Sequence, residues 1–373
     1  MIAERLCPVR WISVVLWCSV LATHHVWPIS RTSAQLVPAT FCFGDSLADP
    51  GNNNYINSLS KANYPFNGID FAAGPTGRFT NGRTTVDILG ELLGFKYYLP
   101  PYMAPSTTGN VIRYGVNYAS GAAGILDSSG YAFIGRIPLS QQLDQFEKTS
   151  AQIIQLLGPE AGSNLIAQSI YSLNLGANDF LDNYYAPFSP IGNLSVGAVN
   201  NLLLSTYQQH LTRLYSMGAR KIVVAAVGPA GCTPYRLTTT LAVNGECDQK
   251  VNQQIQAFNT GLEALLDGLN TNLPGVRFVY LNAYDAVNEI IQNPNAYGFT
   301  ISDTACCGTG GPYKGLLPCT PLSSLCTDRT NYVFWDPYHT SDKANVILSN
   351  RFFYGDSSYA RPMNIQQLAL LNL

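Results

Sequence analysis

Charged side chains are scarce in this sequence. They make up 12% of its 373 residues, with 21 lysines and arginines against 23 aspartates and glutamates, whereas about 25% is usual for globular proteins. The longest basic run is Arg220-Lys221. Because nucleic-acid-binding surfaces need clustered positive charge, we expect no nucleic-acid partner. Asparagine, serine, threonine, glutamine and tyrosine must supply the polar surface instead.

Histidine is also rare, with four copies in the chain. His24 and His25 lie near the N-terminus, which leaves His210 and His339 in the body of the sequence. Two histidines are too few for a histidine-rich metal site, and the cysteines lack the paired C-x-x-C spacing of zinc sites. We therefore expect no metal ion.

Long apolar runs are absent as well. A membrane-spanning helix needs about 18 or more consecutive apolar residues, and the run at residues 11–22 is shorter. This run follows Arg5 and Arg10 and precedes small residues at 32–34, which is the order of a secretory signal peptide. We predict a leader at residues 1–34, cleaved near its end or, alternatively, directly after the apolar run. The mature protein is then secreted and extracellular, without an integral membrane span.

Secretion determines how the cysteines and one asparagine are interpreted. In an oxidising compartment loop cysteines form disulfides, and we expect Cys232 to pair with Cys247 across one polar loop. Cys42 lies inside an apolar run, which is typical of a buried free thiol. Asn193 begins the one N-x-S/T sequence of the chain and is a candidate glycosylation site.

Four further cysteines crowd a single loop. We expect the adjacent Cys306 and Cys307 each to take Cys319 or Cys326, because a bond between neighbours is strained. The sequence leaves both of the remaining pairings open.

Apolar segments of two lengths alternate along the chain. Short runs rich in β-branched and aromatic residues predict strands, and longer amphipathic segments between them predict helices. The expected strands are 39–43, 111–119, 169–175, 221–227 and 276–281, and the expected helices are 84–93, 141–157, 196–217, 249–269 and 341–353. Such β-α repetition favours an α/β fold in which a five-stranded parallel sheet is covered by helices on both faces, a three-layer α/β/α sandwich. We expect one domain at residues 35–373, with ligands beyond the carboxyl ends of the strands.

His339 is the stronger of the two remaining candidates for a general base. His210 lies midway along an expected helix among polar neighbours, where a solvated position is expected. His339 follows Asp336 by three residues, after an apolar stretch that a proline breaks. A turn there would bring the carboxylate to one imidazole nitrogen and leave the other free to accept a proton. A simple turn with an acidic residue before proline remains the alternative.

Two serines occur in a Gly-Asp-Ser tripeptide. Ser46 follows the first expected strand, and Gly44 lets the chain bend so that the hydroxyl faces the cleft. Ser357 follows a helix close to the C-terminus, where we expect a surface turn. Ser46 is therefore the candidate nucleophile.

Small or amide residues follow the next two strands. Gly121 lies in the turn Asn117-Tyr118-Ala119-Ser120-Gly121-Ala122-Ala123-Gly124, and Asn178 follows Leu175-Gly176-Ala177. Each has an ordinary explanation, a glycine turn and a helix cap respectively. Their equivalent positions beyond successive strands make them candidate donors to an oxyanion.

Six stretches occur in a fixed order over nearly the whole mature length: FCFGDSLADPGNNNY, GRFTNGRTTVDILGELLG, VNYASGAAGIL, YSLNLGANDF, KIVVAAVGPAGCTP and YVFWDPYHTSDKAN. With these stretches the chain closely resembles the plant GDSL esterase/lipase family of the SGNH hydrolase superfamily. The resemblance implies a flavodoxin-like fold and no organic cofactor or metal. The block SGAAG departs from the common SGGAG at Ala122.

The resemblance also implies a role for each site residue. Ser46 would be the nucleophile, His339 the general base and then acid, and Asp336 its orienting partner. The oxyanion would be bound by the backbone N–H groups of Ser46 and Gly121 and by the Asn178 amide.

The resemblance implies hydrolysis of a carboxylic ester through an acyl-enzyme. The substrates would be acyl lipids or small acyl esters, and we expect a monomer that degrades lipid or small-molecule esters. Two alternatives stay open: an extracellular acyltransferase that uses the same acyl-enzyme, and a non-catalytic secreted binding protein.

Overall fold

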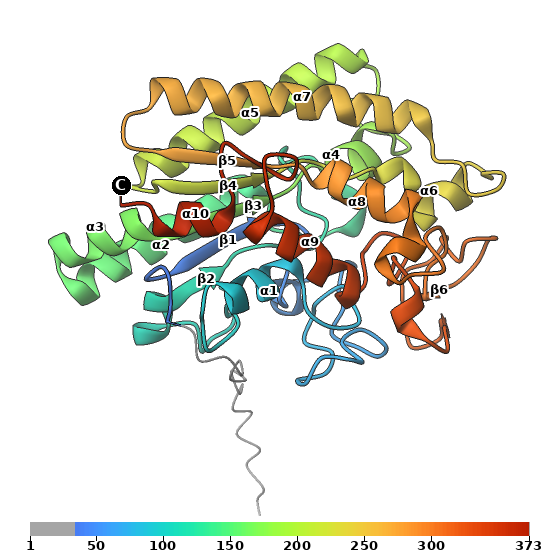
Figure 1. Cartoon of the computed structure of the whole chain (residues 1–373), viewed down its shortest axis with the longest axis horizontal. Coiled ribbons are helices and arrows are strands. Elements are labelled where there is room, and N and C mark those ends of the chain that lie inside the picture. The colour runs from blue at the N-terminus through green and yellow to red at the C-terminus, as the bar shows by residue number, and fades with distance from the viewer. Residues whose placement is uncertain (1–33, 373) are drawn as a thin grey trace, which may run out of the picture.

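The computed structural model describes residues 34–372, so the expected leader at 1–34 lies, apart from its last residue, outside the described residues. A six-stranded sheet forms the centre, in the order β2-β1-β3-β4-β5-β8 (Figure 1). The strands are β1 Thr40–Gly44, β2 Gly115–Asn117, β3 Ile170–Asn174, β4 Lys221–Ala225, β5 Arg277–Leu281 and β8 Ala360–Arg361. The first five run parallel, as nearly continuous apolar strands predict.

The sixth strand corrects the expectation of a five-stranded parallel sheet. β8 pairs with β5 in antiparallel register, with Leu281 opposite Ala360. It has two residues, too few for an alternating pattern to be visible in the sequence.

The second strand is shorter than the expected 111–119. A 3-10 helix, η2 Gly109–Tyr114, occupies its first half, and the strand begins at Gly115 with φ 120°. A Cβ at Gly115 would lie 1.9 Å from the Thr40 carbonyl oxygen. The strand therefore starts where only glycine allows the backbone to approach β1.

Helices cover both faces of the sheet. One face packs against α2 Leu139–Leu157, α3 Pro159–Gln168, α5 Val196–Ser216 and α7 Gln249–Asn272. The other packs against α1 Thr85–Leu92, α8 Ala283–Gln292, α9 Asp342–Tyr354 and α10 Ile365–Leu370. The fold is thus the expected α/β/α sandwich, and all five expected helices are present with ends that differ by a few residues.

Shorter elements lie mainly in the connections. They are α4 Ala177–Asp179, the π-helical turn η4 Phe180–Tyr184, α6 Pro234–Thr239, the hairpin of β6 Cys307–Gly308 and β7 Ser324–Leu325, and the 3-10 turns η1 Asn52–Tyr55, η3 Tyr131–Phe133, η5 Ala230–Cys232, η6 Pro294–Tyr297 and η7 Arg329–Asn331. Within residues 34–372, no helix has the length and apolar character needed to cross a membrane.

The two faces of the sheet carry side chains of different size. On the face toward α2, which we call the filled face, the Phe146 ring packs against the rings of Phe41, Phe43 and Tyr171 at centroid distances of 5.2, 5.8 and 5.4 Å. Alternate residues of the same strands, including Thr40, Cys42 and Ser172, point toward α1 and α9. We call this second side the small-residue face.

The disulfides follow one of the pairings that the sequence left open. Cys232 bonds with Cys247 as expected, Cys306 bonds with Cys326, and Cys307 bonds with Cys319. Cys42 is buried and forms no disulfide within the described residues. Its burial raises the pKa of the thiol to about 12, so the group stays protonated and inert.

Candidate active site

Ser46 lies immediately beyond β1, where the strand is held firmly by a buried glutamine. Gln142 of α2 accepts a hydrogen bond from the Gly44 N–H through Oε1 and donates to the Gly44 carbonyl through Nε2, both at 2.9 Å. The next residue, Asp45, donates its N–H to the Asn174 carbonyl at 3.2 Å. The Ser46 side chain is half-buried and emerges at the carboxyl edge of the sheet, where ligands are expected in parallel sheets.

Asp336 and His339 belong to one tight turn. Asp336 Oδ1 accepts the backbone N–H groups of Tyr338 and His339 at 2.9 and 2.8 Å. The backbone N–H of Trp335 donates to the His339 carbonyl at 2.7 Å, which closes the turn. The turn therefore fixes the carboxylate and the imidazole relative to each other.

The imidazole connects the carboxylate to the serine. His339 Nδ1 lies 2.7 and 2.8 Å from the two Asp336 carboxylate oxygens, and His339 Nε2 lies 2.7 Å from Ser46 Oγ. Both Asp336 and His339 are buried, and the Phe79 ring packs against the imidazole at 5.1 Å between centroids. With the proton on Nδ1 donated to the carboxylate, the unprotonated Nε2 faces the hydroxyl and accepts its hydrogen bond.

The disulfide loop supports this turn from behind. Cys306, Cys307, Cys319 and Cys326 form a buried cluster with the Trp335 ring. Cys307 donates its N–H to the Trp335 carbonyl at 2.7 Å, and the indole Nε1 donates to Asn67 Oδ1 at 3.0 Å. The two disulfides thus fix the residue directly before Asp336.

The three expected oxyanion donors differ in how free they are. The Ser46 N–H makes no hydrogen bond with any residue of the described part of the chain. Asn178 uses one amide hydrogen to bind the Ala123 carbonyl at 2.7 Å, and the other has no partner among residues 34–372. The Gly121 N–H is already donated to Asp49 Oδ2 at 2.9 Å, so Gly121 does not offer a free donor in this conformation.

Asp49 is a residue that the sequence reasoning missed. Besides Gly121, it accepts the N–H groups of Gly51 and Asn52 at 2.7 and 2.6 Å. Burial raises the pKa of this carboxyl to about 6, while the donated N–H groups oppose the shift. Its position three residues after Ser46 suggests that Asp49 lies near the site. Its hydrogen bond to Gly121, in the loop after β2, could not be inferred from sequence spacing.

A second missed carboxylate, Asp179, fixes the loop after β2. It accepts the N–H groups of Ile125 and Leu126 at 2.8 and 2.9 Å and the Ser129 hydroxyl at 2.7 Å. Burial raises its pKa to about 6. The loop that carries Gly121 is therefore held by one buried aspartate at each end.

Ala122 adopts a backbone conformation that glycine favours. Its φ is 69°, in the left-handed region that costs an alanine roughly 1–2 kcal/mol. This conformation accounts for the glycine that the resemblance leads one to expect at this position. The alanine side chain is accommodated, and the loop keeps its hydrogen bonds.

Two more carboxyl groups lie near the imidazole, the buried Asp45 and the half-buried Asp182. Burial raises the pKa of both Asp45 and Asp182 to about 7, and the nearby His339 opposes each shift. Asp45 accepts the Leu47 N–H at 2.9 Å. The imidazole therefore has two further carboxyl groups near it besides Asp336.

The remaining candidates lie apart from this site. Ser357 is exposed in a turn, as expected for the second Gly-Asp-Ser. His210 is half-buried on α5, rather than solvated, and burial lowers the pKa of its imidazole. Asn193 is exposed in the connection that leads into α5.

The chain is similar in sequence to known proteins. The model of the GDSL-like Lipase/Acylhydrolase family matches residues 40–352. The chain is 47% identical over 337 residues to GDSL esterase/lipase At2g23540 of Arabidopsis thaliana, covering 88% of this chain and 87% of that protein. It is 46% identical over 340 residues to At4g16230 of the same plant, covering 90% and 92%.

Among solved structures, an acetylxylan esterase from Geobacillus stearothermophilus is 11% identical, with a TM-score of 0.39, and the match covers 84% of this chain and 92% of that chain.

Proposed function

The chain belongs to the GDSL-like lipase/acylhydrolase family and is a carboxylic ester hydrolase, and we propose that it works through an acyl-enzyme formed on Ser46. The observation that carries the proposal is the continuous contact of Asp336, His339 and Ser46, with 2.7 Å at each junction. A hydroxyl becomes nucleophilic when a neutral imidazole can take its proton.

The first half of the reaction forms the acyl-enzyme. Ser46 Oγ attacks the ester carbonyl while His339 Nε2 takes the hydroxyl proton, and Asp336 stabilises the resulting imidazolium. The negative charge that develops on the carbonyl oxygen is met by the Ser46 N–H and the free Asn178 amide hydrogen. The C–O bond to the alcohol then breaks, and His339 returns the proton to the leaving oxygen.

The second half releases the acid. Water attacks the acyl carbon, His339 takes its proton, and the Ser46 oxygen leaves and is reprotonated. Gly121 becomes a third donor only if its N–H turns away from Asp49. We propose that the products are a free acid and an alcohol, and that the substrates are acyl lipids or small acyl esters.

The test compares the two Gly-Asp-Ser serines. Ser46→Ala should lower turnover of a short-chain chromogenic ester by about 10⁴-fold or more and should prevent labelling by an organophosphonate. Ser357→Ala, in the same tripeptide on an exposed turn, should do neither. Labelling that persists in Ser46→Ala would refute the assignment, and an acylated added alcohol in place of free acid would identify an acyltransferase.

We further propose that residues 1–34 are a leader, and that 35–373 form one secreted hydrolase domain that acts as a monomer. Three disulfides and the exposed Asn193 support this proposal, since disulfides persist in oxidising compartments. All the proposed catalytic groups come from one chain. N-terminal sequencing of the exported protein, and loss of a glycan-dependent mass shift in Asn193→Gln, would check it.

A further inference from the structure

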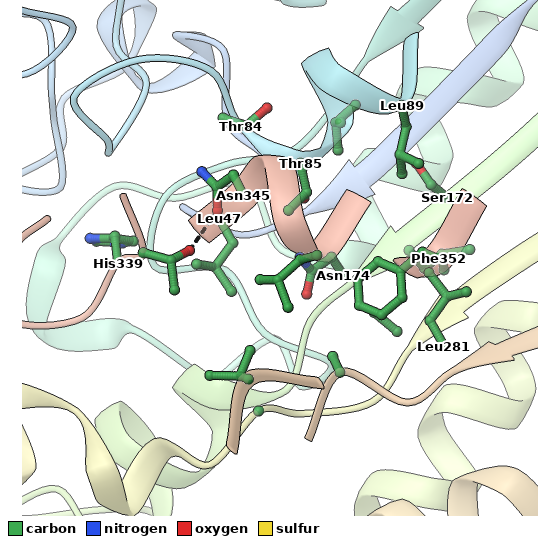
Figure 2. A pocket seen from close by; sticks show the side chains of 18 of the residues that line it. Leu47, Thr84, Thr85, Leu89, Ser172, Asn174, Leu281, His339, Asn345 and Phe352 are labelled. Carbon is green, nitrogen blue, oxygen red and sulfur yellow. Dashed lines mark hydrogen bonds between the residues drawn. The ribbon is translucent and has the colours of Figure 1, made fainter. Parts of the chain in front are cut away.

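A cavity of about 160 Å³ lies on the small-residue face, between the sheet and helices α1 and α9. His339 and Leu47 line it at the active site, and Leu281 and Phe352 line it farther inside. Figure 2 shows these side chains in a row that leads from His339 to Phe352. The cavity therefore begins at the catalytic histidine and continues beneath the helices.

Small side chains in the sheet leave this space open. Thr40, Ser172 and Ala225 line the cavity on β1, β3 and β4. Ser172 is in the middle of a central strand, yet it is only partly buried. A residue at such a position, under a covering helix, is accessible only if the space beside it is not filled.

A glycine on α1 enlarges the same space. Val86, Leu89, Gly90 and Leu93 recur at the spacing of one helix face, and all of them line the cavity. A Cβ placed on Gly90 would meet no atom within 4 Å. The row of apolar side chains on α1 is therefore interrupted where it faces the sheet, although glycine is disfavoured inside helices.

We propose that this cavity is a channel for the acyl chain of the substrate, and that the enzyme prefers esters of straight-chain acids of medium length. The inference rests on the proposed function, because the channel has this meaning only if the ester carbonyl is held at Ser46. The walls are mainly apolar, with Leu89, Leu348 and Phe352 among them. Transfer of a methylene chain from water to such walls is favourable in free energy. Transfer of a sugar or a charged acid is unfavourable, because the polar groups lose their hydration.

The length of the channel sets the preferred acid. It is lined from Thr40, at the start of β1, to Leu47, beyond its end. The four steps along that strand cover about 13 Å, which an extended chain spans with roughly ten carbons at about 1.2 Å per bond. Each methylene that becomes buried should raise kcat/KM about fourfold, until the chain reaches the closed end.

The test narrows the channel at Gly90. Wild-type kcat/KM should rise from the 4-nitrophenyl acetate ester to the decanoate ester and should not rise further for the palmitate ester. In Gly90→Leu the ratio of decanoate to acetate kcat/KM should fall at least about tenfold, because the new side chain occupies space that methylenes would fill. Gly90→Ala, the smaller change, should lower the ratio about fourfold, by the volume of one methylene.

Gly268 provides the matched control. It is also a half-buried helical glycine whose Cβ would meet no atom within 4 Å, but it lies on α7 and does not line the cavity. Gly268→Leu should keep the wild-type ratio. The ratio is independent of how much enzyme is folded, so an unchanged ratio in both Gly90 variants would overturn the channel.

Failure of the channel is separable from failure of the proposed function. A wild-type protein that hydrolyses acetate and decanoate esters with equal kcat/KM would be a hydrolase without this channel. If the wild type hydrolyses neither ester, the binding of decanoic acid is measured in Ser46→Ala and in the double variant Ser46→Ala/Gly90→Leu. Binding that is at least about tenfold weaker in the double variant supports the channel. Equal binding in the two variants, or no binding to Ser46→Ala, overturns it.

Discussion

The two faces of the central sheet are built by alternate residues of the same strands, and they differ in packing: one is filled by large side chains, and the other borders a cavity. Phe41 and Phe43 of β1 point to the filled face, where their rings pack against Phe146 and Tyr118 at centroid distances of 5.1 to 5.8 Å. Thr40 and Cys42, their neighbours in the chain, point to the face where the cavity lies. The period of two in a strand lets one segment supply a rigid support on one side and space on the other.

The filled face also explains how Ser46, the proposed nucleophile, is held. Gln142, which brackets the Gly44 peptide, and Phe146, which packs under β1, are separated by one turn of α2. The same helix surface thus packs the strand and fixes its end. Ser46 follows two residues later, so the precision of its hydroxyl depends on packing that it does not touch.

Matched leucine truncations should show the largest difference between the faces. Leu143 of α2 and Leu348 of α9 are 0% and 4% exposed, but Leu348 lines the cavity. Leu143→Ala should lower the free energy of unfolding by about 3–5 kcal/mol, because it opens a void in a close-packed core. Leu348→Ala should cost about 2 kcal/mol, because part of its surface already lacks partner atoms.

Urea denaturation of the two variants measures this difference directly. Equal losses in Leu143→Ala and Leu348→Ala would mean that the two faces are packed alike, and that the cavity does not relieve the side chains around it.

Much of the fold and the site could be predicted because the signals are local. Strand ends, the Asp336-x-x-His339 turn and the position of Ser46 follow from apolar runs, glycine and spacing over a few residues. β8 escaped prediction because two residues have no periodicity, and its position depends on the β5 edge that it covers. The choice among the four loop cysteines depended on how that loop folds around Trp335.

Contacts between segments that are distant in the sequence could not be predicted either. Nothing in the sequence places Asp49 against Gly121, which lies 72 residues later, and so the hydrogen bond that occupies the Gly121 N–H could not be predicted. The cavity likewise depends on which strand residues lie opposite Gly90. The sequence shows that Gly90 lacks a side chain, but it does not show whether the space beside Gly90 is empty.

A buried charge on the filled side should give the next largest effect. Asp45 is fully buried near Tyr207 of α5, and burial raises its pKa from 3.8 to about 7. The folded state therefore binds this proton more tightly than the unfolded state, so the contribution of Asp45 to stability is fully present below about pH 4 and is lost as the pH rises through about 7. Asp45→Asn keeps an acceptor for the Leu47 N–H without the charge.

Measurements at several pH values isolate this contribution. The free energy of unfolding of Asp45→Asn should match that of the wild type near pH 4 and exceed it by on the order of 2–4 kcal/mol at pH 8. A difference that stays constant between pH 4 and 8 would show that Asp45 is ionised throughout, held by donors rather than penalised by burial.

Glycine-to-alanine changes on the two sides should give the smallest effects, and with opposite signs. A Cβ at Gly162 of α3 would lie 2.7 Å from the Ile154 Cα of α2, whereas one at Gly90 would meet nothing within 4 Å. Gly162→Ala should destabilise the protein by about 1–3 kcal/mol, since backbone must move. Gly90→Ala should stabilise it by about 0.5–1 kcal/mol through helix propensity, while it shortens the preferred acyl chain. Thermal unfolding measures the change in stability, and the ratio of decanoate to acetate kcat/KM measures the change in chain-length preference. A Gly90→Ala variant that is less stable than the wild type would mean that its methyl group clashes with neighbouring atoms. The small-residue face would then be packed as fully as the filled face.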